Sequence, residues 1–182
     1  KSGINQMIRV VTLNAKGPDD IAPRGEEGQI IALLAGDEAF EGYWRRPEAD
    51  AKSLRDGWFF GSDTGYFDKD GDLFVTGRLD DMIISGGENV SPVEIESMLS
   101  LHPAVSEVAV VGLPDERWGK VVTAFIAAKT PVTAEDLDSY CAKSTLANFK
   151  RPRKFVFVRE IPKSPVGKLL RRKLVAGEYE TI

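Results

Sequence analysis

The stretch TGRLDDMIISGGENV, residues 76–90, separates two parts of the chain that differ in texture. Residues 82–84 predict a short buried strand, and Gly86-Gly87 permits positive φ and a close approach of the backbone to a partner. The arginine and the two acids that precede this strand have no evident packing role. We therefore expect a joint between two units within this stretch.

Length and composition bound the class of protein. The 182 residues suffice for one large domain or two small ones, and 42% hydrophobic with 29% charged residues is typical of a soluble globular chain. The single cysteine, Cys141, excludes an intramolecular disulfide. Because a lone cysteine is natural in a reducing compartment, we expect a cytoplasmic protein. No apolar run is long enough to span a membrane, and the first residues do not form a signal peptide. The chain begins at Lys1, so we expect a processed product, a fragment or part of something longer.

Charge is distributed unevenly. Residues 143–173 hold eleven of the 24 Lys and Arg residues but only one of the 28 acids, Glu160, which leaves 13 bases and 27 acids elsewhere. Such a block can recognise a polyanion, or it can be a solvated face that docks on the acidic remainder. The acidity of the whole chain argues against nucleic acid as the partner.

The part before the joint predicts mostly β structure. We expect strands at residues 7–13, 29–34 and 57–60, a helix that begins at Pro47, and a hairpin over residues 66–75. The alternation of Asp68, Asp70 and Asp72 is similar to the start of a calcium loop, but a hairpin turn at residues 68–71 explains it better.

The part after the joint alternates β and α segments and predicts a compact α+β domain. Strands are expected at residues 82–84, 105–112, 121–128 and 155–158, and helices after Ser91, after Thr133 and over residues 168–176. Ser91, Pro92 and Glu94 predict a helix start with a capping box. Cys141 falls on the expected buried face of the second helix.

Two isolated residues are candidates for ligand contacts. Asp63 lies among glycines, where its carboxylate could accept hydrogen bonds from a ribose diol, or could hold its own backbone in an Asx-turn. Trp118 lies in a polar turn, where it could stack on a base or cover a sheet edge. His102 is the only histidine, which argues against a zinc site or a catalytic triad.

Two basic segments are further candidates. Phe149, Arg151 and Arg153 combine a stacking face with cations, which suits a phosphorylated nucleotide, although a nucleic-acid patch has the same composition. Lys168 is expected at the N-terminus of the last helix, where the helix dipole disfavours a cation. It could reduce the repulsion between an attacking carboxylate and a phosphate, or it could be an exposed loop lysine.

Taken together, these segments resemble the C-terminal part of the acyl-adenylate-forming enzymes, which include acyl- and aryl-CoA synthetases, luciferases and peptide-synthetase adenylation domains. The matching segments are Glu41-Gly42-Tyr43-Trp44 with Pro47-Glu48-Ala49, Gly57-Trp58-Phe59 before Asp63, Gly77-Arg78-Leu79-Asp80-Asp81-Met82-Ile83, Gly86-Gly87-Glu88-Asn89, and Gly167-Lys168-Leu169-Leu170-Arg171-Arg172. The chain looks most like the halobenzoate- and fatty-acid-CoA ligases. It departs from the usual pattern at Gly61-Ser62, where Thr-Gly is common, and at Ile84, where a lysine is common.

The resemblance implies roles for matching residues. Asp63 and Arg78 would hold the ribose hydroxyls of ATP and AMP, Asp80 would be the hinge of a mobile domain, and Lys168 would be the adenylation lysine. The residues implied in binding CoA are Gly86, Gly87, Trp118, Phe149, Arg151 and Arg153.

The resemblance also implies an organisation and an activity. Residues 1–79 would be the last β subdomain of a large domain, and residues 80–182 a small mobile C-terminal domain. The large N-terminal domain, with its phosphate loop and acid pocket, would be a missing partner, so we expect this chain to be inactive alone. The implied reaction joins a carboxylic acid to CoA with ATP and magnesium, giving AMP and pyrophosphate, and no metal is expected to be bound by these residues. Alternatives are an adenylation domain that loads a carrier protein and a non-catalytic anion-binding module.

Overall fold

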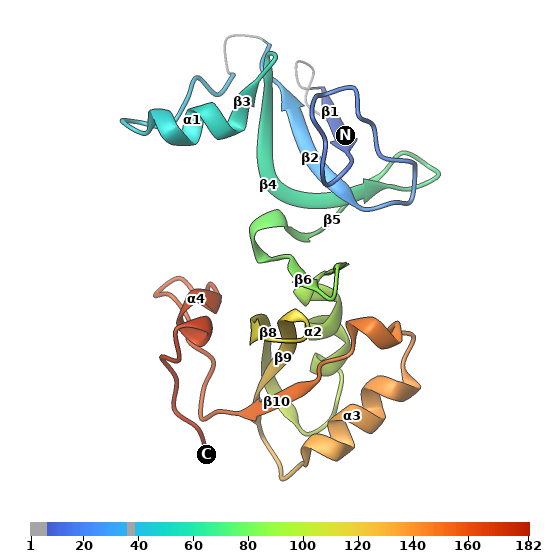
Figure 1. The fold of residues 1–182 in the computed structure, drawn as a ribbon, viewed down its shortest axis with the longest axis vertical. Helices are drawn as coiled ribbons and strands as arrows, with labels where there is room; N and C mark the ends of the chain where they lie inside the picture. Colours follow the sequence, from blue (N-terminus) through green and yellow to red (C-terminus); the bar gives the residue numbers. More distant parts are fainter. Residues whose placement is uncertain (1–6, 36–38) are drawn as a thin grey trace. The chain divides into compact units, whose positions relative to one another are not determined.

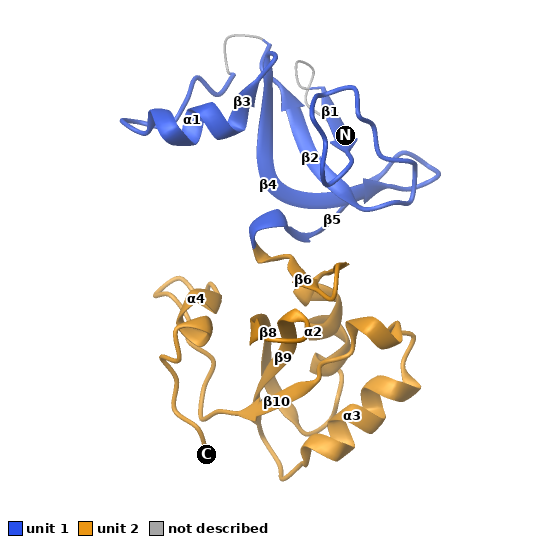
Figure 2. Ribbon diagram, viewed as in Figure 1, with its two compact units in different colours: residues 1–80 blue, residues 81–182 orange. Residues whose placement is uncertain are grey.

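The computed structural model describes residues 7–35 and 39–182, so the start of the chain at residues 1–6 lies outside the described residues. The chain divides into two compact units, Lys1–Asp80 and Asp81–Ile182 (Figure 2). Each unit is built around its own sheet.

The first unit is an antiparallel sheet with one short helix (Figure 1). Its elements are β1 (Ile8–Val11), β2 (Gly28–Leu33), α1 (Pro47–Ser53), β3 (Leu54–Arg55), β4 (Trp58–Phe67) and β5 (Leu73–Arg78). The strand order is β1-β2-β4-β3, and β5 pairs with β4. A small core forms where Val11, Ile31, Trp58 and Phe60 are buried together. The strands and the helix start predicted for this part are confirmed, but the strand predicted at residues 57–60 extends to Phe67.

The long strand β4 corrects the expected placement of Asp63. The sequence suggested a glycine-bracketed loop between two strands, whereas β4 continues through this segment to Phe67. A Cβ at Gly65 would lie 2.3 Å from the carbonyl oxygen of Phe74, so glycine is needed where the backbone of β5 approaches. The glycine therefore serves a close strand contact, and Asp63 is a strand residue opposite Arg78.

The turn between β4 and β5 confirms the predicted hairpin. The carboxylate of Asp68 accepts hydrogen bonds from the backbone N–H groups of Asp70 and Asp72, both at 2.9 Å. The alternating acids therefore shape the turn through their own backbone, as Asx-turns do.

The second unit mixes a three-stranded sheet, a hairpin and helices, which confirms the predicted α+β class. Its elements are β6 (Ile83–Ser85), β7 (Glu88–Val90), α2 (Pro92–Ser100), β8 (Val105–Asp115), β9 (Gly119–Ala128), α3 (Ala134–Lys143), β10 (Lys154–Phe157) and α4 (Arg171–Val175). The sheet order is β10-β9-β8, in which β10 runs parallel and β8 antiparallel to β9.

The sheet of the second unit is buried on both faces. Successive residues of β8 alternate between two cores, with Val108 and Val110 in one and Ala109 and Val111 in the other. The first core includes side chains of α2 and α3, and the second includes Leu174 of α4. Because neither face meets water, β9 reads as a continuous apolar run rather than as an alternating one.

The start of α2 differs from the predicted capping box. Ser91 is the N-cap and Pro92 occupies the first turn, but the Ser91 side chain makes no capping hydrogen bond. The carboxylate of Glu94 instead contacts the Lys150 ammonium at 2.6 Å. A long-range ion pair has thus replaced the local bond. In α3 the Thr133 cap is confirmed, with a capping box to Asp136.

The last helix begins later than predicted. It starts at Arg171, so Lys168 does not lie at a helix N-terminus and the conflict with the helix dipole does not arise. Lys168 lies instead in a tight turn, where its carbonyl accepts the N–H of Ser164 at 2.8 Å. The N–H of Gly167 donates to the Ser164 carbonyl at 2.9 Å, and Gly167 has φ +81°. The positive φ explains why the turn needs glycine at this position.

Truncation of Leu99 tests the packing of α2. Leu99 is fully buried, so Leu99→Ala is expected to lower the free energy of unfolding by about 2–5 kcal/mol, because a cavity remains. Leu101, at the end of the same helix, is 77% exposed. Leu101→Ala is therefore expected to change the free energy of unfolding by about 0.5 kcal/mol or less. Urea unfolding of both variants measures the difference. Equal midpoints would contradict this description of the core.

Candidate functional site

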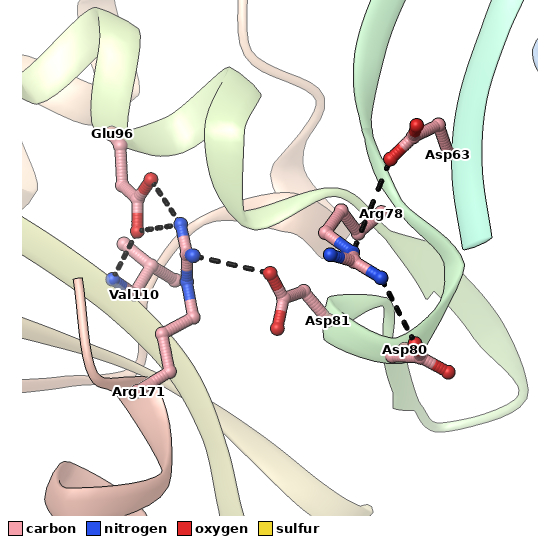
Figure 3. Close-up of polar contacts among 7 residues, drawn as sticks. All are labelled: Asp63, Arg78, Asp80, Asp81, Glu96, Val110 and Arg171. Atoms are coloured by element: carbon pink, nitrogen blue, oxygen red, sulfur yellow. Dashed lines mark hydrogen bonds and ion pairs between the residues drawn. The ribbon is translucent and has the colours of Figure 1, made fainter. Parts of the chain in front are cut away.

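An exposed charged cluster marks the end of the first unit. Asp63 on β4 and Arg78 on β5 are cross-strand partners, and the Arg78 Nε lies 4.0 Å from Asp63 Oδ1. The Arg78 Nη2 lies 3.6 Å from Asp80 Oδ2, so Arg78 lies between the two acids (Figure 3). All three side chains are more than half exposed. Such exposed pairs contribute little to stability, which leaves these groups available to a ligand.

A further acid, Glu27, which the sequence analysis did not single out, links the two strands of the same hairpin. Glu27 accepts hydrogen bonds from the hydroxyls of Thr64, at 3.0 Å, and Thr76. Thr64 is fully buried, one residue from Asp63. The bonds hold β4 and β5 together beside the charged cluster. Because Glu27 is far from both threonines in sequence, only their β propensity could have hinted at this contact.

Asp80 belongs to a short 3-10 helix, Leu79–Asp81, that joins the two units. Its side chain is 71% exposed. Its neighbour Asp81 is less exposed and binds the Arg171 guanidinium at 3.1 Å. The two adjacent acids of the joint therefore have different partners, one in each unit.

The glycine pair forms the turn of a hairpin that the sequence analysis did not predict. Gly86 and Gly87 have φ of +60° and +89°, and Ser85 pairs with Glu88. Two glycines between short β-prone runs are the signal for such a turn. The predicted buried strand is shifted by one residue to β6, and only one of its two isoleucines is buried. Ile83 faces the core and Ile84 is exposed.

Trp118 packs against this turn. Its carbonyl accepts the N–H of Gly86 at 2.9 Å, and a Cβ on Gly86 would lie 2.7 Å from Trp118 Cε3. The guanidinium of Arg117 lies 4.7 Å from the centre of its ring, and that of Arg153 4.3 Å. The half-buried indole is therefore held among cations and the glycine turn.

Two other residues expected at this place have different environments. Arg151 binds Asp138 at 2.6 Å, so its charge is already paired. Phe149 lies on a short 3-10 helix, Asn148–Lys150, and is exposed, with the Lys150 ammonium 5.8 Å from its ring centre. The structure thus brings together Gly86, Trp118 and Arg153, and gives Arg151 a separate partner.

Lys168 is an exposed residue on an anchored turn. Its N–H donates to the Ser164 hydroxyl at 3.1 Å, and a β-bridge joins Lys163 to Leu169 on either side. Its amine forms no ion pair within residues 7–35 and 39–182. A free ammonium on a fixed turn can be presented to an anionic ligand.

Much of the basic block docks on acidic residues. Six of its cations form ion pairs with acids outside the block, and the pairs are Lys150–Glu94, Arg151–Asp138, Arg159–Glu180, Lys163–Glu107, Arg171–Glu96 with Asp81, and Lys173–Glu178. The structure therefore supports the docked interpretation for these six residues.

The described residues contain no group of three or more His, Cys, Asp or Glu that could hold a metal ion. His102 packs edge-on against Tyr140, with ring centres 4.9 Å apart, and its Nδ1 accepts the N–H of Ala104 at 3.2 Å. Among the helices in the described ranges, none has the length and apolarity to span a membrane.

The predicted burial of Cys141 is confirmed, and burial raises the pKa of its thiol to about 11. The unfolded thiol has a pKa of about 8.5, so this difference stabilises the fold below pH ~8.5, and the contribution is lost as the pH rises toward 11. Wild type is therefore expected to lose more unfolding free energy between pH 8.5 and 11 than Cys141→Ala, which lacks the thiol. Urea titrations of both proteins across this range measure the difference. Parallel pH profiles would contradict the prediction.

The chain is similar to known proteins in sequence and in fold. Residues 94–168 match the family model of the AMP-binding enzyme C-terminal domain. The 4-chlorobenzoate–CoA ligase of an Arthrobacter species is 47% identical over 174 residues, which is 96% of this chain and 33% of that protein. In sequence and fold this chain matches the C-terminal part of proteins of the acyl-adenylate-forming superfamily.

Two solved structures extend the comparison. The o-succinylbenzoate CoA synthetase of Bacillus subtilis, in complex with its acyl-adenylate intermediate, matches with a TM-score of 0.82 and 37% identity, over 94% of this chain and 34% of that one. ATP-bound MatB from Rhodopseudomonas palustris matches with a TM-score of 0.84 and 34% identity, over 95% and 34%. The chain thus spans about a third of the length of the proteins that it matches.

Proposed function

We propose that this chain is the C-terminal part of an ATP-dependent carboxylic acid–CoA ligase. The observation that carries the proposal is the exposed Asp63–Arg78 pair, which leads directly into Asp80 at the joint. A carboxylate can accept hydrogen bonds from two adjacent hydroxyls, and a neighbouring guanidinium can donate to the same ribose. Its relatives include a CoA ligase and a synthetase solved with an acyl-adenylate, which supports the same chemistry.

The proposed reaction has two steps. In the first, a carboxylate oxygen of the acid attacks the α-phosphorus of ATP, and the bond to pyrophosphate breaks to give acyl-AMP. Lys168 would lie between the two anionic reactants and lower their repulsion. In the second, the sulfur of CoA attacks the acyl carbon, the bond to AMP breaks, and the thiol proton leaves. ATP would enter with magnesium, which would offset part of the negative charge of its phosphates.

The residues around Trp118 would bind CoA in the second step. We propose that Gly86 and Gly87 allow close passage of the pantetheine chain, because neither carries a side chain. Trp118, Phe149, Arg151 and Arg153 would contact the nucleotide of CoA. The ring of Trp118 and the guanidinium of Arg153 already lie together, which supports these two more strongly than Arg151, whose charge Asp138 neutralises.

The two steps suggest that the enzyme consists of two domains that move relative to each other. We propose that residues 1–79 form the last β subdomain of a large domain, that residues 80–182 form a small mobile domain, and that Asp80 is the hinge between them. A large N-terminal domain would supply the phosphate loop and the acid pocket. We also propose a cytoplasmic location, with which the single cysteine is consistent.

Product analysis tests this function. A full-length ligase that contains these residues is expected to convert acid, ATP and CoA into equal amounts of acyl-CoA, AMP and pyrophosphate. The 182-residue chain alone is expected to form none. Turnover by the isolated chain would contradict the proposed dependence on a large domain. Formation of ADP and phosphate would contradict the ligase class itself.

A substitution at Trp118 tests the proposed acceptor. Loss of a stacked aromatic ring weakens nucleotide binding by about 1–3 kcal/mol, so Trp118→Ala is expected to raise the KM for CoA by about 5- to 150-fold. Adenylation without CoA is expected to keep its rate. Trp44, which is 84% exposed in the first unit, provides the control Trp44→Ala. An unchanged KM for CoA in Trp118→Ala would exclude the ring from the acceptor site.

A further inference from the structure

Lys168 lies in the turn of residues 163–170, which we call the Lys168 turn. A half-buried arginine, Arg171, connects this turn to the rest of the second unit. The Arg171 Nη2 contacts both carboxylate oxygens of Glu96, at 2.9 and 2.6 Å, and Nη1 contacts Asp81 at 3.1 Å. Figure 3 shows the guanidinium between the two acids. Its side chain is 18% exposed and that of Glu96 is 12% exposed. This cluster is much less exposed than the Asp63–Arg78 pair.

Glu96 in turn is tied to the sheet. One of its oxygens accepts the backbone N–H of Val110 at 2.8 Å. Val110 lies on β8, an edge strand of the three-stranded sheet, so Glu96 provides an acceptor for a backbone amide of that strand. Arg171 is therefore linked through one carboxylate to α2 and to β8. We call Arg171, Glu96, Asp81 and the Val110 amide the Arg171 cluster.

Arg171, at the centre of this cluster, follows Lys168 by three residues in the sequence. Between them, the N–H of Leu170 donates to the Pro162 carbonyl at 2.9 Å, and Leu169 packs against the second core. At the other end of the turn, Lys163 forms an ion pair with Glu107 on β8. The turn is thus fixed to the edge strand at both ends, while Lys168 itself is exposed.

We propose that Arg171 is a positioning residue that fixes the Lys168 turn and the residue after the hinge to one rigid body. The planar guanidinium holds two acids from two nitrogens at a fixed angle, Glu96 from Nη2 and Asp81 from Nη1, whereas an ammonium is a point charge. The fork at Arg171 sets both the position and the angle at which α4 begins. The turn before α4 is joined directly to this helix, so the orientation of α4 also determines the orientation of Lys168. The inference rests on the proposed role of Lys168 and adds the residue that holds it in place.

The test compares half-reactions in the full-length ligase. Arg171→Lys keeps the charge but loses the fork. Because misplacement of a reacting group by about 1 Å can cost on the order of 100-fold in rate, we expect the kcat of adenylation to fall by roughly 10- to 100-fold. The KM values for ATP and acid are expected to change little, and thioester formation from supplied acyl-AMP is expected to stay near wild type. Arg172→Lys, the same change at an exposed neighbour, is the matched control and is expected to behave as wild type.

A double variant shows whether Arg171 acts through Lys168. If it does, Arg171→Lys combined with Lys168→Ala is no slower in adenylation than Lys168→Ala alone, because effects within one unit are not additive. Wild-type adenylation in Arg171→Lys, multiplied losses in the double variant, or equal loss of both half-reactions would each overturn the inference. The last result would mean a general folding defect.

Hydrogen exchange separates this inference from the proposed function. In Arg171→Lys and in Glu96→Gln, amides of residues 163–170 are expected to exchange faster while those of α3 do not change. If Lys168→Ala left adenylation intact, the proposed role of Lys168 would fall, and the exchange data would still decide whether Arg171 anchors the turn. Unchanged exchange in residues 163–170 would overturn the anchor.

Discussion

Lys168→Ala in the full-length ligase is expected to lower the rate of adenylation by about 100- to 1,000-fold, the usual cost of removing one preorganised charge from a reacting anion. Lys168 is exposed on a turn whose two ends are fixed to the edge strand β8, directly by the Lys163–Glu107 ion pair and, through Glu96, by Arg171. Its ammonium is therefore free to meet a ligand while its backbone is held. The assay is acid-dependent pyrophosphate release in a single turnover.

The same variant is expected to form thioester from supplied acyl-AMP at close to the wild-type rate. In the second step a sulfur attacks the acyl carbon and AMP leaves, so no carboxylate has to approach a phosphorus and this cation is not needed. Lys168→Arg, which keeps the charge, is the control and is expected to retain part of the adenylation rate. Equal losses in both half-reactions for Lys168→Ala would contradict the assigned role.

Asp80→Pro is expected to separate the two half-reactions in a different way. Proline fixes φ near about −65° and removes the backbone N–H, so a residue that must change its backbone angles no longer can. Asp80 lies in the 3-10 helix Leu79–Asp81, at the boundary of the two units. If the small domain turns about Asp80 between the two steps, the substitution restricts that turn, and we expect turnover to fall much more than one of the isolated steps.

Asp80→Ala is the matched control for this prediction. It removes the carboxylate that faces Arg78, 3.6 Å away, but leaves the backbone free, so we expect it to be much less damaging. Rapid-quench measurement of acyl-AMP and acyl-CoA in the same reaction distinguishes the two steps. Wild-type rates of both steps in Asp80→Pro would exclude Asp80 as the hinge.

Local patterns in the sequence predicted most elements and the fold class. Hydrophobic spacing located β2, β9 and α2, and the Asp-Lys-Asp-Gly turn located the β4–β5 hairpin. The buried Cys141 followed from the same helical spacing. These features depend on residues that are close in sequence, where propensity and period are informative.

The errors have a different physical origin, because each involves a contact between distant segments. Gly65 resembled a loop residue, but it permits the approach of Phe74 across the hairpin. Glu94 matched a capping box, but it pairs with Lys150, 56 residues away. The helix expected from residue 168 starts only at Arg171, where Glu96 and Asp81 bind the guanidinium. None of these contacts could be read from a local pattern.

The candidate site also combines residues that could be located from the sequence with contacts between distant segments that could not. The resemblance identified Asp63 and Arg78, and the structure makes them cross-strand neighbours. It identified Lys168 but not the Arg171 cluster that holds its turn. It grouped Arg151 with Trp118, although Asp138 binds Arg151, while Arg153 and Arg117 lie over the indole. Single candidate residues were therefore easier to locate from the sequence than the side chains that contact them.

The most direct test of the central claim is acid-dependent exchange of labelled pyrophosphate into ATP by the full-length ligase without CoA. If acyl-AMP forms as a separate intermediate, the first step is reversible without CoA, and label enters ATP only when the acid is present. We expect this exchange in wild type and its loss in Lys168→Ala. Exchange that requires CoA, or that persists without the acid, would contradict an acyl-adenylate mechanism for this chain.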